Sequence, residues 1–143
     1  HDLIKRNSRF AAILIPHEKA DARITAGLVK SHLCSVDDMP FDNNYIDKIF
    51  HCHCYYHWPD RQKYCKEILR VFKPGGLTVT SQAAFNYQFS VGNAFFRHEQ
   101  VHHEVYMEDL RKAGFLNVQL EEINKDSQKI YWAIQASAPQ SSA

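Results

Sequence analysis

The chain has 143 residues, enough for one domain with a hydrophobic core, and 45% apolar with 23% charged residues is typical of an ordinary globular protein. A formal net charge of +1 gives no electrostatic basis for binding nucleic acid or an anionic membrane. The sequence contains no apolar run of membrane-spanning length and no signal-peptide pattern at its start, so we expect no membrane contact. The four cysteines (Cys34, Cys52, Cys54 and Cys65) do not form the pattern of a secreted disulfide framework, which favours a cytoplasmic location.

The N-terminal part of the sequence predicts two helical segments and one strand. Residues 3–14 have helix-like apolar spacing, and residues 17–26 form a second, more polar helical segment. Residues 28–34 then predict a strand that leads into the loop at 35–37. Because the chain opens with His1 rather than methionine, we expect a fragment or a processed product.

The middle of the sequence predicts a strand, a helix and a second strand. Residues 46–54 are expected to form a short strand and its outlet, and a helix is expected over residues 61–72, with Lys73 adding positive charge to its last turn. The Pro-Gly-Gly run at 74–76 should stop the helix, and residues 77–81 form the next strand. This order predicts a right-handed crossover, the unit of a parallel α/β sheet.

The C-terminal part of the sequence is regular except for its beginning. Residues 82–105 break the helix and strand patterns and are rich in aromatic side chains. A short helix is expected over residues 107–115, with Gly114 as its stop signal. Residues 118–123 and part of 130–136 alternate apolar and polar side chains, which predicts a terminal antiparallel pair of strands.

Three motifs in the middle of the chain carry a family resemblance. They are Asp38-Met39-Pro40-Phe41 with Asn44-Tyr45-Ile46-Asp47, then Tyr55-Tyr56-His57-Trp58-Pro59-Asp60, then Glu67-Ile68-Leu69-Arg70-Val71-Phe72-Lys73-Pro74-Gly75-Gly76. In this order and spacing they resemble the C-terminal two thirds of a class I S-adenosylmethionine-dependent methyltransferase of the methyltransferase-11 type. The resemblance implies an α/β fold with a partial Rossmann-like sheet, mostly parallel with an antiparallel C-terminal strand pair, in one N-terminally incomplete domain over residues 1–143. It also implies S-adenosylmethionine-dependent methyl transfer to a small-molecule acceptor.

The resemblance also assigns residues to the cofactor. In the family, the loop after the third strand touches the adenine, and this loop corresponds to Ser35, Val36 and Asp37 here. Ser35 stands where the family usually has an acidic residue, and its hydroxyl can accept a proton from the adenine amine but carries no charge. The end of the following strand passes the methionine part of the cofactor in the family, which corresponds to His51 and Cys52.

Two histidines and three aromatic residues are candidates for contact with the methyl acceptor. Methyl transfer from a sulfonium depends on positioning and on exclusion of water, and a hydroxyl or enol acceptor also benefits from a general base, for which His57 and His53 are the candidates. Tyr56, Phe85 and Phe95 could line an apolar acceptor pocket. The open alternative is that these histidines and aromatic rings are ordinary packed residues.

The resemblance implies that residues 82–105 form a cover over this pocket, and it also shows what the sequence lacks. None of the five glycines (Gly27, Gly75, Gly76, Gly92 and Gly114) forms the family's glycine-rich cofactor loop, so we expect this chain to bind S-adenosylmethionine weakly or not at all. The family's first two strands are missing as well, which leaves the strand at 28–34 without neighbours. It could pair directly with residues 46–51, or with a second chain in a homo-oligomer.

Two other functions remain open. His98-Glu99-Gln100-Val101-His102 matches the zinc hydrolase pattern H-E-x-x-H, in which two histidines one helical turn apart bind the metal and the glutamate acts as base. The His-Cys-His-Cys run at 51–54 looks like a second metal cluster, but neighbouring residues on a strand point to opposite faces, so no metal is expected there. The second alternative is a non-catalytic methyltransferase-like interaction module.

Overall fold

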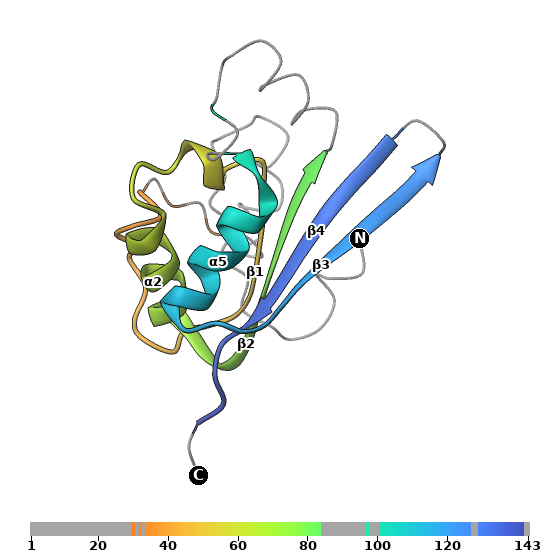
Figure 1. Ribbon diagram of the computed structural model, residues 1–143. Coiled ribbons are helices and arrows are strands. Elements are labelled where there is room, and N and C mark those ends of the chain that lie inside the picture. Colours follow the sequence, from red (N-terminus) through yellow and green to blue (C-terminus); the bar gives the residue numbers. More distant parts are fainter. Residues whose placement is uncertain are drawn as a thin grey trace.

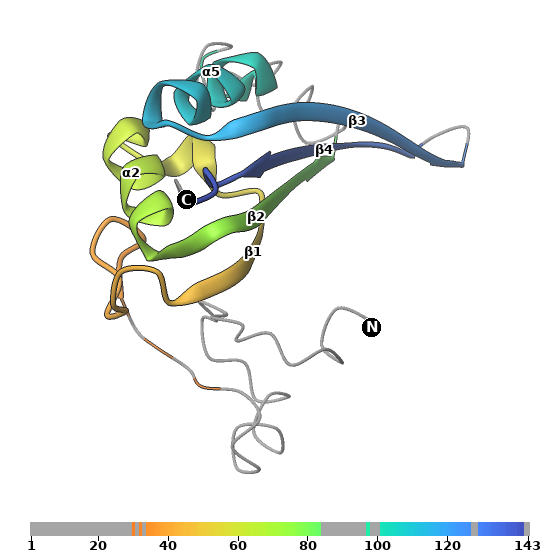
Figure 2. The same ribbon diagram turned by 90° about the horizontal axis from the view of Figure 1, so that it is seen from below.

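The computed structural model describes residues 30, 32, 34–83, 97, 101–126 and 129–141. In chain order these contain β1 (Ile46–Cys52), the short 3-10 helix η3 (Tyr55–His57), α2 (Arg61–Val71), β2 (Phe72–Ala83), α5 (His103–Ala113), β3 (Leu116–Asp126) and β4 (Lys129–Ser137). The strands form one mixed sheet in the order β1-β2-β4-β3. Both α-helices pack on the same face of this sheet (Figures 1 and 2).

The expected crossover is confirmed. β1 and β2 are parallel neighbours, with Ile49 opposite Thr78 and His51 opposite Thr80, and the chain between the two strands forms η3 and α2. α2 begins at Arg61, and the carboxylate of the preceding Asp60 accepts a hydrogen bond of 3.1 Å from the Lys63 N–H and so caps the helix. The carboxyl ends of both parallel strands therefore meet at the edge of the sheet from which η3 departs.

The end of α2 differs from the expectation. The helix ends at Val71, and Lys73 lies in β2, where its Nζ is 2.8 Å and 2.9 Å from the carboxylate oxygens of Asp47 on β1. Phe72 has extended backbone and pairs with Ile46, so strand pairing begins before the Pro-Gly-Gly run and the helix ends one residue earlier than expected. Local sequence signals could not show this competition, because the partner is more than 20 residues away.

The C-terminal half of the sheet is antiparallel, as expected. β2 pairs with β4, and β4 pairs with β3, so the predicted antiparallel strand pair is confirmed, and its hairpin extends past the helices (Figure 1). α5 begins at His103, four residues before the expected start, and ends at Ala113. The next residue, Gly114, has the left-handed φ of 108° that glycine adopts without strain. Its N–H donates to the carbonyls of Arg111 and Leu110 and closes the helix.

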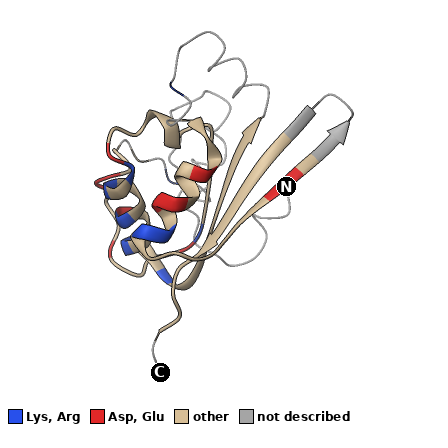
Figure 3. Ribbon diagram, viewed as in Figure 1, with Lys and Arg blue, Asp and Glu red and all other residues tan. Residues whose placement is uncertain are grey.

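The core lies between the two helices and the sheet. Its fully buried large side chains include Ile46, Tyr55, Ile68, Val71, Phe72, Tyr106, Leu110 and Ile134. β2 adds three buried polar residues on the same face, Thr78, Thr80 and Gln82. The charged residues of α2 are mostly basic, whereas α5 has its acidic residues first and its basic residues in the last turn (Figure 3).

The expected strand at residues 28–34 is not found in the part of it that the structure describes. Lys30, His32 and Cys34 have no strand conformation, and the one described neighbour of β1 is β2. A strand is stable only beside a partner, so direct pairing with β1 is not supported, while pairing with a second chain stays a prediction. The two helices expected over residues 3–14 and 17–26 lie outside the described residues.

Candidate functional site

The carboxyl ends of β1 and β2 form the centre of the candidate site. β1 ends at Cys52, and His53 then turns the chain with a left-handed φ of 52° while its N–H donates to the Ser81 carbonyl at 3.1 Å. The turn leads directly into η3, whose last residue is His57. Open α/β sheets bind ligands outside the carboxyl ends of their strands, so these residues occupy the position where a ligand is expected.

Both ring nitrogens of His51 take part in a hydrogen-bond network on the helix side of the sheet. Its Nε2 lies 2.7 Å from Thr80 Oγ1 and 3.0 Å from the Tyr106 hydroxyl, and its Nδ1 lies 3.0 Å from Cys54 Sγ. Burial lowers the pKa of His51 to about 4 and raises the pKa of the Cys54 thiol to about 12. Both groups are therefore neutral near pH 7, and only the backbone of His51 is left for a ligand at the strand end.

The contact between His51 and Cys54 corrects the expectation that these two side chains diverge. The divergence assumed a continuous strand, but the left-handed turn at His53 swings Cys54 back towards the helix side. Even so, the described part of the chain contains no group of three or more residues suited to hold a metal ion.

A second buried network anchors η3 and was not predicted from the sequence. The Tyr55 hydroxyl contacts the Gln82 side chain through a hydrogen bond and lies 2.6 Å from the Val101 carbonyl. The Tyr55 ring also stacks on Tyr106, with centroids 4.4 Å apart. The signal in the sequence was the alternation of polar residues along β2, which places Thr78, Thr80 and Gln82 on one face of a strand expected to be buried.

The two candidate general bases lie on the turn. His53 is half-buried, and burial lowers its pKa, so its imidazole is neutral at pH 7 and able to accept a proton. His57 is exposed at the end of η3, and its ring centroid lies 4.6 Å from that of Tyr56. Burial is the main cause that raises the pKa of Tyr56, and the nearby Cys54 and Cys52 raise it further, so the phenol stays protonated. The structure thus brings three of the predicted residues onto one short turn.

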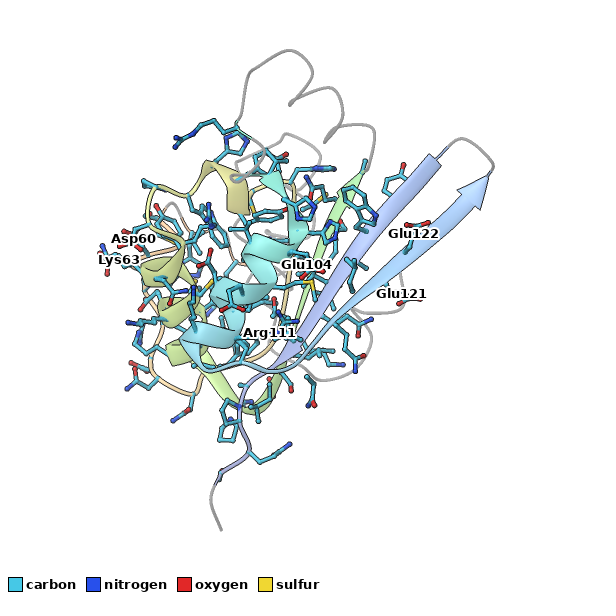
Figure 4. All side chains as sticks on the ribbon, in the orientation of Figure 1. Asp60, Lys63, Glu104, Arg111, Glu121 and Glu122 are labelled. Carbon is cyan, nitrogen blue, oxygen red and sulfur yellow. The ribbon has the colours of Figure 1, made fainter. Side chains whose placement is uncertain are left out.

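The loop at Ser35 to Asp37 lies against the beginning of α2. The Asp37 carboxylate accepts a hydrogen bond from the Ser35 hydroxyl, and its second oxygen lies 2.7 Å from Lys63 Nζ. Figure 4 shows Lys63 beside the helix cap Asp60. Because α2 begins just after η3, this ion pair places the loop at the same end of the sheet as the strand end at Cys52.

The segment that follows this loop runs along α2 and is held by Arg70. Its guanidinium donates to the carbonyls of Met39 at 3.2 Å and Phe41 at 2.9 Å, and it forms two hydrogen bonds of 2.6 Å and 2.7 Å with Glu67. Glu67 in turn accepts a hydrogen bond from the Met39 N–H at 2.9 Å. We call these contacts the Arg70 clamp. The Lys63–Asp37 ion pair holds the loop near the first turn of α2, and the Arg70 clamp holds the following segment near the last turn.

Several predicted residues cannot be placed. Phe85 and Phe95 lie outside the described residues, as does most of the expected cover over 82–105. His98 and Glu99 of the H-E-x-x-H pattern are outside them as well. His102 is described, and it stands at the start of α5 as the helix cap, with its Nδ1 accepting a hydrogen bond of 3.3 Å from the Glu104 N–H.

The described cysteines and helices bear on the setting of the protein. Cys34, Cys52, Cys54 and Cys65 are all free thiols. Among the described helices, none combines the length and the apolar character needed to cross a membrane. The cytoplasmic location itself stays a prediction.

Comparison with known proteins gives consistent matches. A family model described as a methyltransferase domain matches residues 6–80. Among curated proteins, the chloroplastic 2-methyl-6-phytyl-1,4-hydroquinone methyltransferase of Spinacia oleracea is 29% identical over 116 residues, covering 76% of this chain and 32% of that protein. The chain thus spans about a third of the length of this relative.

Solved structures match the fold. The [4+2]-cyclase SpnF has a TM-score of 0.65 at 18% identity, with 85% of this chain and 61% of that chain covered. The phosphoethanolamine N-methyltransferase 2 of Haemonchus contortus, in complex with phosphomonomethylethanolamine and S-adenosylhomocysteine, has a TM-score of 0.64 at 18% identity, with 86% and 40% covered. At these identities the likeness shows the fold alone.

Proposed function

The chain belongs to the methyltransferase-domain family, and from this premise we propose that the protein transfers a methyl group from S-adenosylmethionine to a small-molecule acceptor. The observation that supports this most is the ion pair between Lys63 and Asp37, because it joins the loop expected at the adenine to the end of the sheet where β1 and β2 finish. The loop assigned to the adenine and the strand end assigned to the methionine part therefore lie at the same edge of the sheet.

The proposal assigns each part of the cofactor to described residues. Ser35, Val36 and Asp37 face the adenine, while Cys52 and the backbone of His51 border the methionine part. The cofactor supplies an electrophilic methyl group on its sulfonium sulfur. The protein's task is then to hold the acceptor in line with that methyl group and to exclude water.

The acceptor side of the site is formed by the turn at the end of β1. Tyr56 contributes aromatic surface to an acceptor pocket, with Phe85 and Phe95 as further predicted contacts. For a hydroxyl or enol acceptor, the imidazole of His53 or His57 takes the proton as the new bond to carbon forms. The acceptor of the Spinacia relative is a hydroquinone by its name, and a phenol-type hydroxyl would need such a base.

Calorimetric titration of the chain with S-adenosylhomocysteine tests the proposal. Because the sequence has no glycine-rich cofactor loop, we expect a weak dissociation constant, roughly in the millimolar range. Cys52→Phe fills the space at the carboxyl end of β1 and should weaken binding by at least about 10-fold. Lys48→Phe is the matched control, since Lys48 is also exposed on β1 but lies nearer the opposite end of the strand, about 13 Å away.

The outcomes separate the functions considered. Equal weakening by both variants would argue against a site at the strand end, and absence of any heat with the wild-type chain would favour the non-catalytic interaction module. A stoichiometric zinc ion in purified protein, lost on His98→Ala, would favour the hydrolase instead. Micromolar affinity in the wild-type chain would confirm the site and refute the expectation of weak binding.

A further inference from the structure

The turn at Ser35 has a hydrogen-bond geometry that the sequence does not predict. The Asp38 N–H donates to the Ser35 carbonyl at 3.2 Å and closes a tight turn. Within this turn the Asp37 carboxylate folds back on the Ser35 hydroxyl, which donates its hydrogen to Oδ1. The other carboxylate oxygen is held by Lys63 Nζ at 2.7 Å. The Ser35 side chain stays exposed, so its oxygen is accessible to a ligand.

The hydrogen bond to Asp37 changes what Ser35 can recognise. A free serine hydroxyl both donates and accepts, so alone it would tolerate either an amino or an oxo group on a purine ring. With its hydrogen committed to a carboxylate, Ser35 Oγ presents only lone pairs. It then accepts a hydrogen bond from an amine and has nothing to donate to an oxo group.

The ionisation of Asp37 favours this arrangement at neutral pH. Its hydrogen bond to Lys63, and then that to Ser35, hold the pKa of the Asp37 carboxyl below its usual range. The carboxylate is therefore ionised at neutral pH. The ion pair itself is exposed and contributes little to folding, so its removal leaves the protein folded.

We propose that Asp37 is a positioning residue that acts through Ser35 and makes the loop select an aminopurine over an oxopurine. This inference rests on the proposed function, because it deepens the recognition of the adenine of S-adenosylmethionine. The pair of Ser35 and Asp37 thus replaces the acidic side chain that the sequence lacks at position 35. The negative charge reaches the purine amine through the serine hydroxyl.

The test compares two ligands that differ only in the purine. Dissociation constants for S-adenosylhomocysteine and S-inosylhomocysteine are measured by NMR titration of the whole chain, which detects weak binding. We expect the wild-type chain to prefer the adenosyl compound by at least about 10-fold. Asp37→Asn, whose amide can donate as well as accept, should reduce this preference to within about 2-fold. Asp38→Asn removes the same charge from the same turn and should retain the preference.

Each result of the titration has a distinct meaning. Binding of the adenosyl compound without preference, an unchanged preference in Asp37→Asn, or an equal loss in Asp38→Asn would overturn the inference and leave the proposed function standing. If the wild-type chain bound neither compound, the proposed function would fail, and the inference with it. Thermal unfolding of both variants checks that neither loses its fold.

A ligand-free measurement tests the contact itself. Titration of the carboxyl carbons by NMR should give Asp37 a pKa below that of an ordinary aspartate. Ser35→Ala and Lys63→Met each remove one hydrogen bond and should raise that pKa. An Asp37 titration that Ser35→Ala leaves unmoved would show that the hydroxyl is not bound to the carboxylate, and the inference would be overturned.

Discussion

At the scale of single residues, burial of His51 links the stability of the fold to pH. Its pKa in the folded protein is about 4, below the value of about 6.5 in an unfolded chain. Between these two values the unfolded state binds more protons, so the free energy of unfolding rises with pH from about 4 to about 6.5 and this contribution is constant above that range. The full effect is on the order of 3 kcal/mol.

Urea denaturation between pH 4 and pH 7 measures this slope. We expect the wild-type chain to lose stability as the pH falls and His51→Gln to show a shallower dependence, because glutamine does not titrate. The variant will be less stable overall, so the comparison concerns the slope and not the absolute free energy. Identical slopes in the two proteins would contradict a buried neutral His51.

Tyr55 provides a second residue-scale prediction. Tyr55→Phe leaves the buried Gln82 side chain and the Val101 carbonyl without the hydroxyl, and we expect a loss of about 1–3 kcal/mol in the free energy of unfolding. Tyr64→Phe is the matched control: its ring stacks on Trp58 at 5.0 Å, and this stack is kept, so less than about 0.5 kcal/mol should be lost. Equal losses would show that the Tyr55 hydroxyl contributes no more to the free energy of unfolding than the Tyr64 hydroxyl does.

At the scale of elements, the Arg70 clamp joins α2 to the segment before β1. The planar guanidinium matches two carbonyls and a carboxylate at once, which an ammonium group cannot do. Arg70→Lys should therefore cost about 1–3 kcal/mol of unfolding free energy and speed amide hydrogen exchange in residues 39–45.

Arg111 offers the control for this prediction. It lies on the exposed side of α5 (Figure 4), 3.8 Å from Glu108, in an ion pair of the kind that stabilises little. Arg111→Lys should change the unfolding free energy by less than about 0.5 kcal/mol. Unchanged exchange rates in residues 39–45 of Arg70→Lys would mean that the clamp does not order this segment.

The elements that were predictable from the sequence are those with a local signal. The helix before Gly114 and the C-terminal hairpin follow from regular periodicity and from a glycine stop, and the crossover follows from strand, helix and strand in order. The elements that were not predictable depend on distant partners. Lys73 lies in β2 and not in α2 because Phe72 pairs with Ile46 on β1. Residues 28–34 have no described strand beside them.

The candidate site shows the same division. The strand end at Cys52 and the turn with Tyr56 could be located from motifs and from the rule for parallel sheets. The roles within the site could not, because the left-handed turn at His53 decides which side chains meet, and no local pattern predicts it. His51 consequently lies in a buried network with Tyr106 rather than facing a ligand with its ring.

At the scale of the whole molecule, the proposed function requires a nucleoside ligand to bind at one edge of the sheet. The proposed ligand site is at the carboxyl ends of β1 and β2, whereas the first residues of β3 lie on the far strand of the sheet and at its opposite end (Figure 1). The two regions therefore act as the site and as an internal reference in one experiment.

The most direct measurement is the mapping of S-adenosylhomocysteine onto the chain by 1H–15N NMR titration. We expect saturable shift changes in residues 35–37 and 52–57, and none in residues 116–118 at the start of β3. Changes that saturate in β3 but not at the strand ends, or no saturable change at all, would contradict the proposed site.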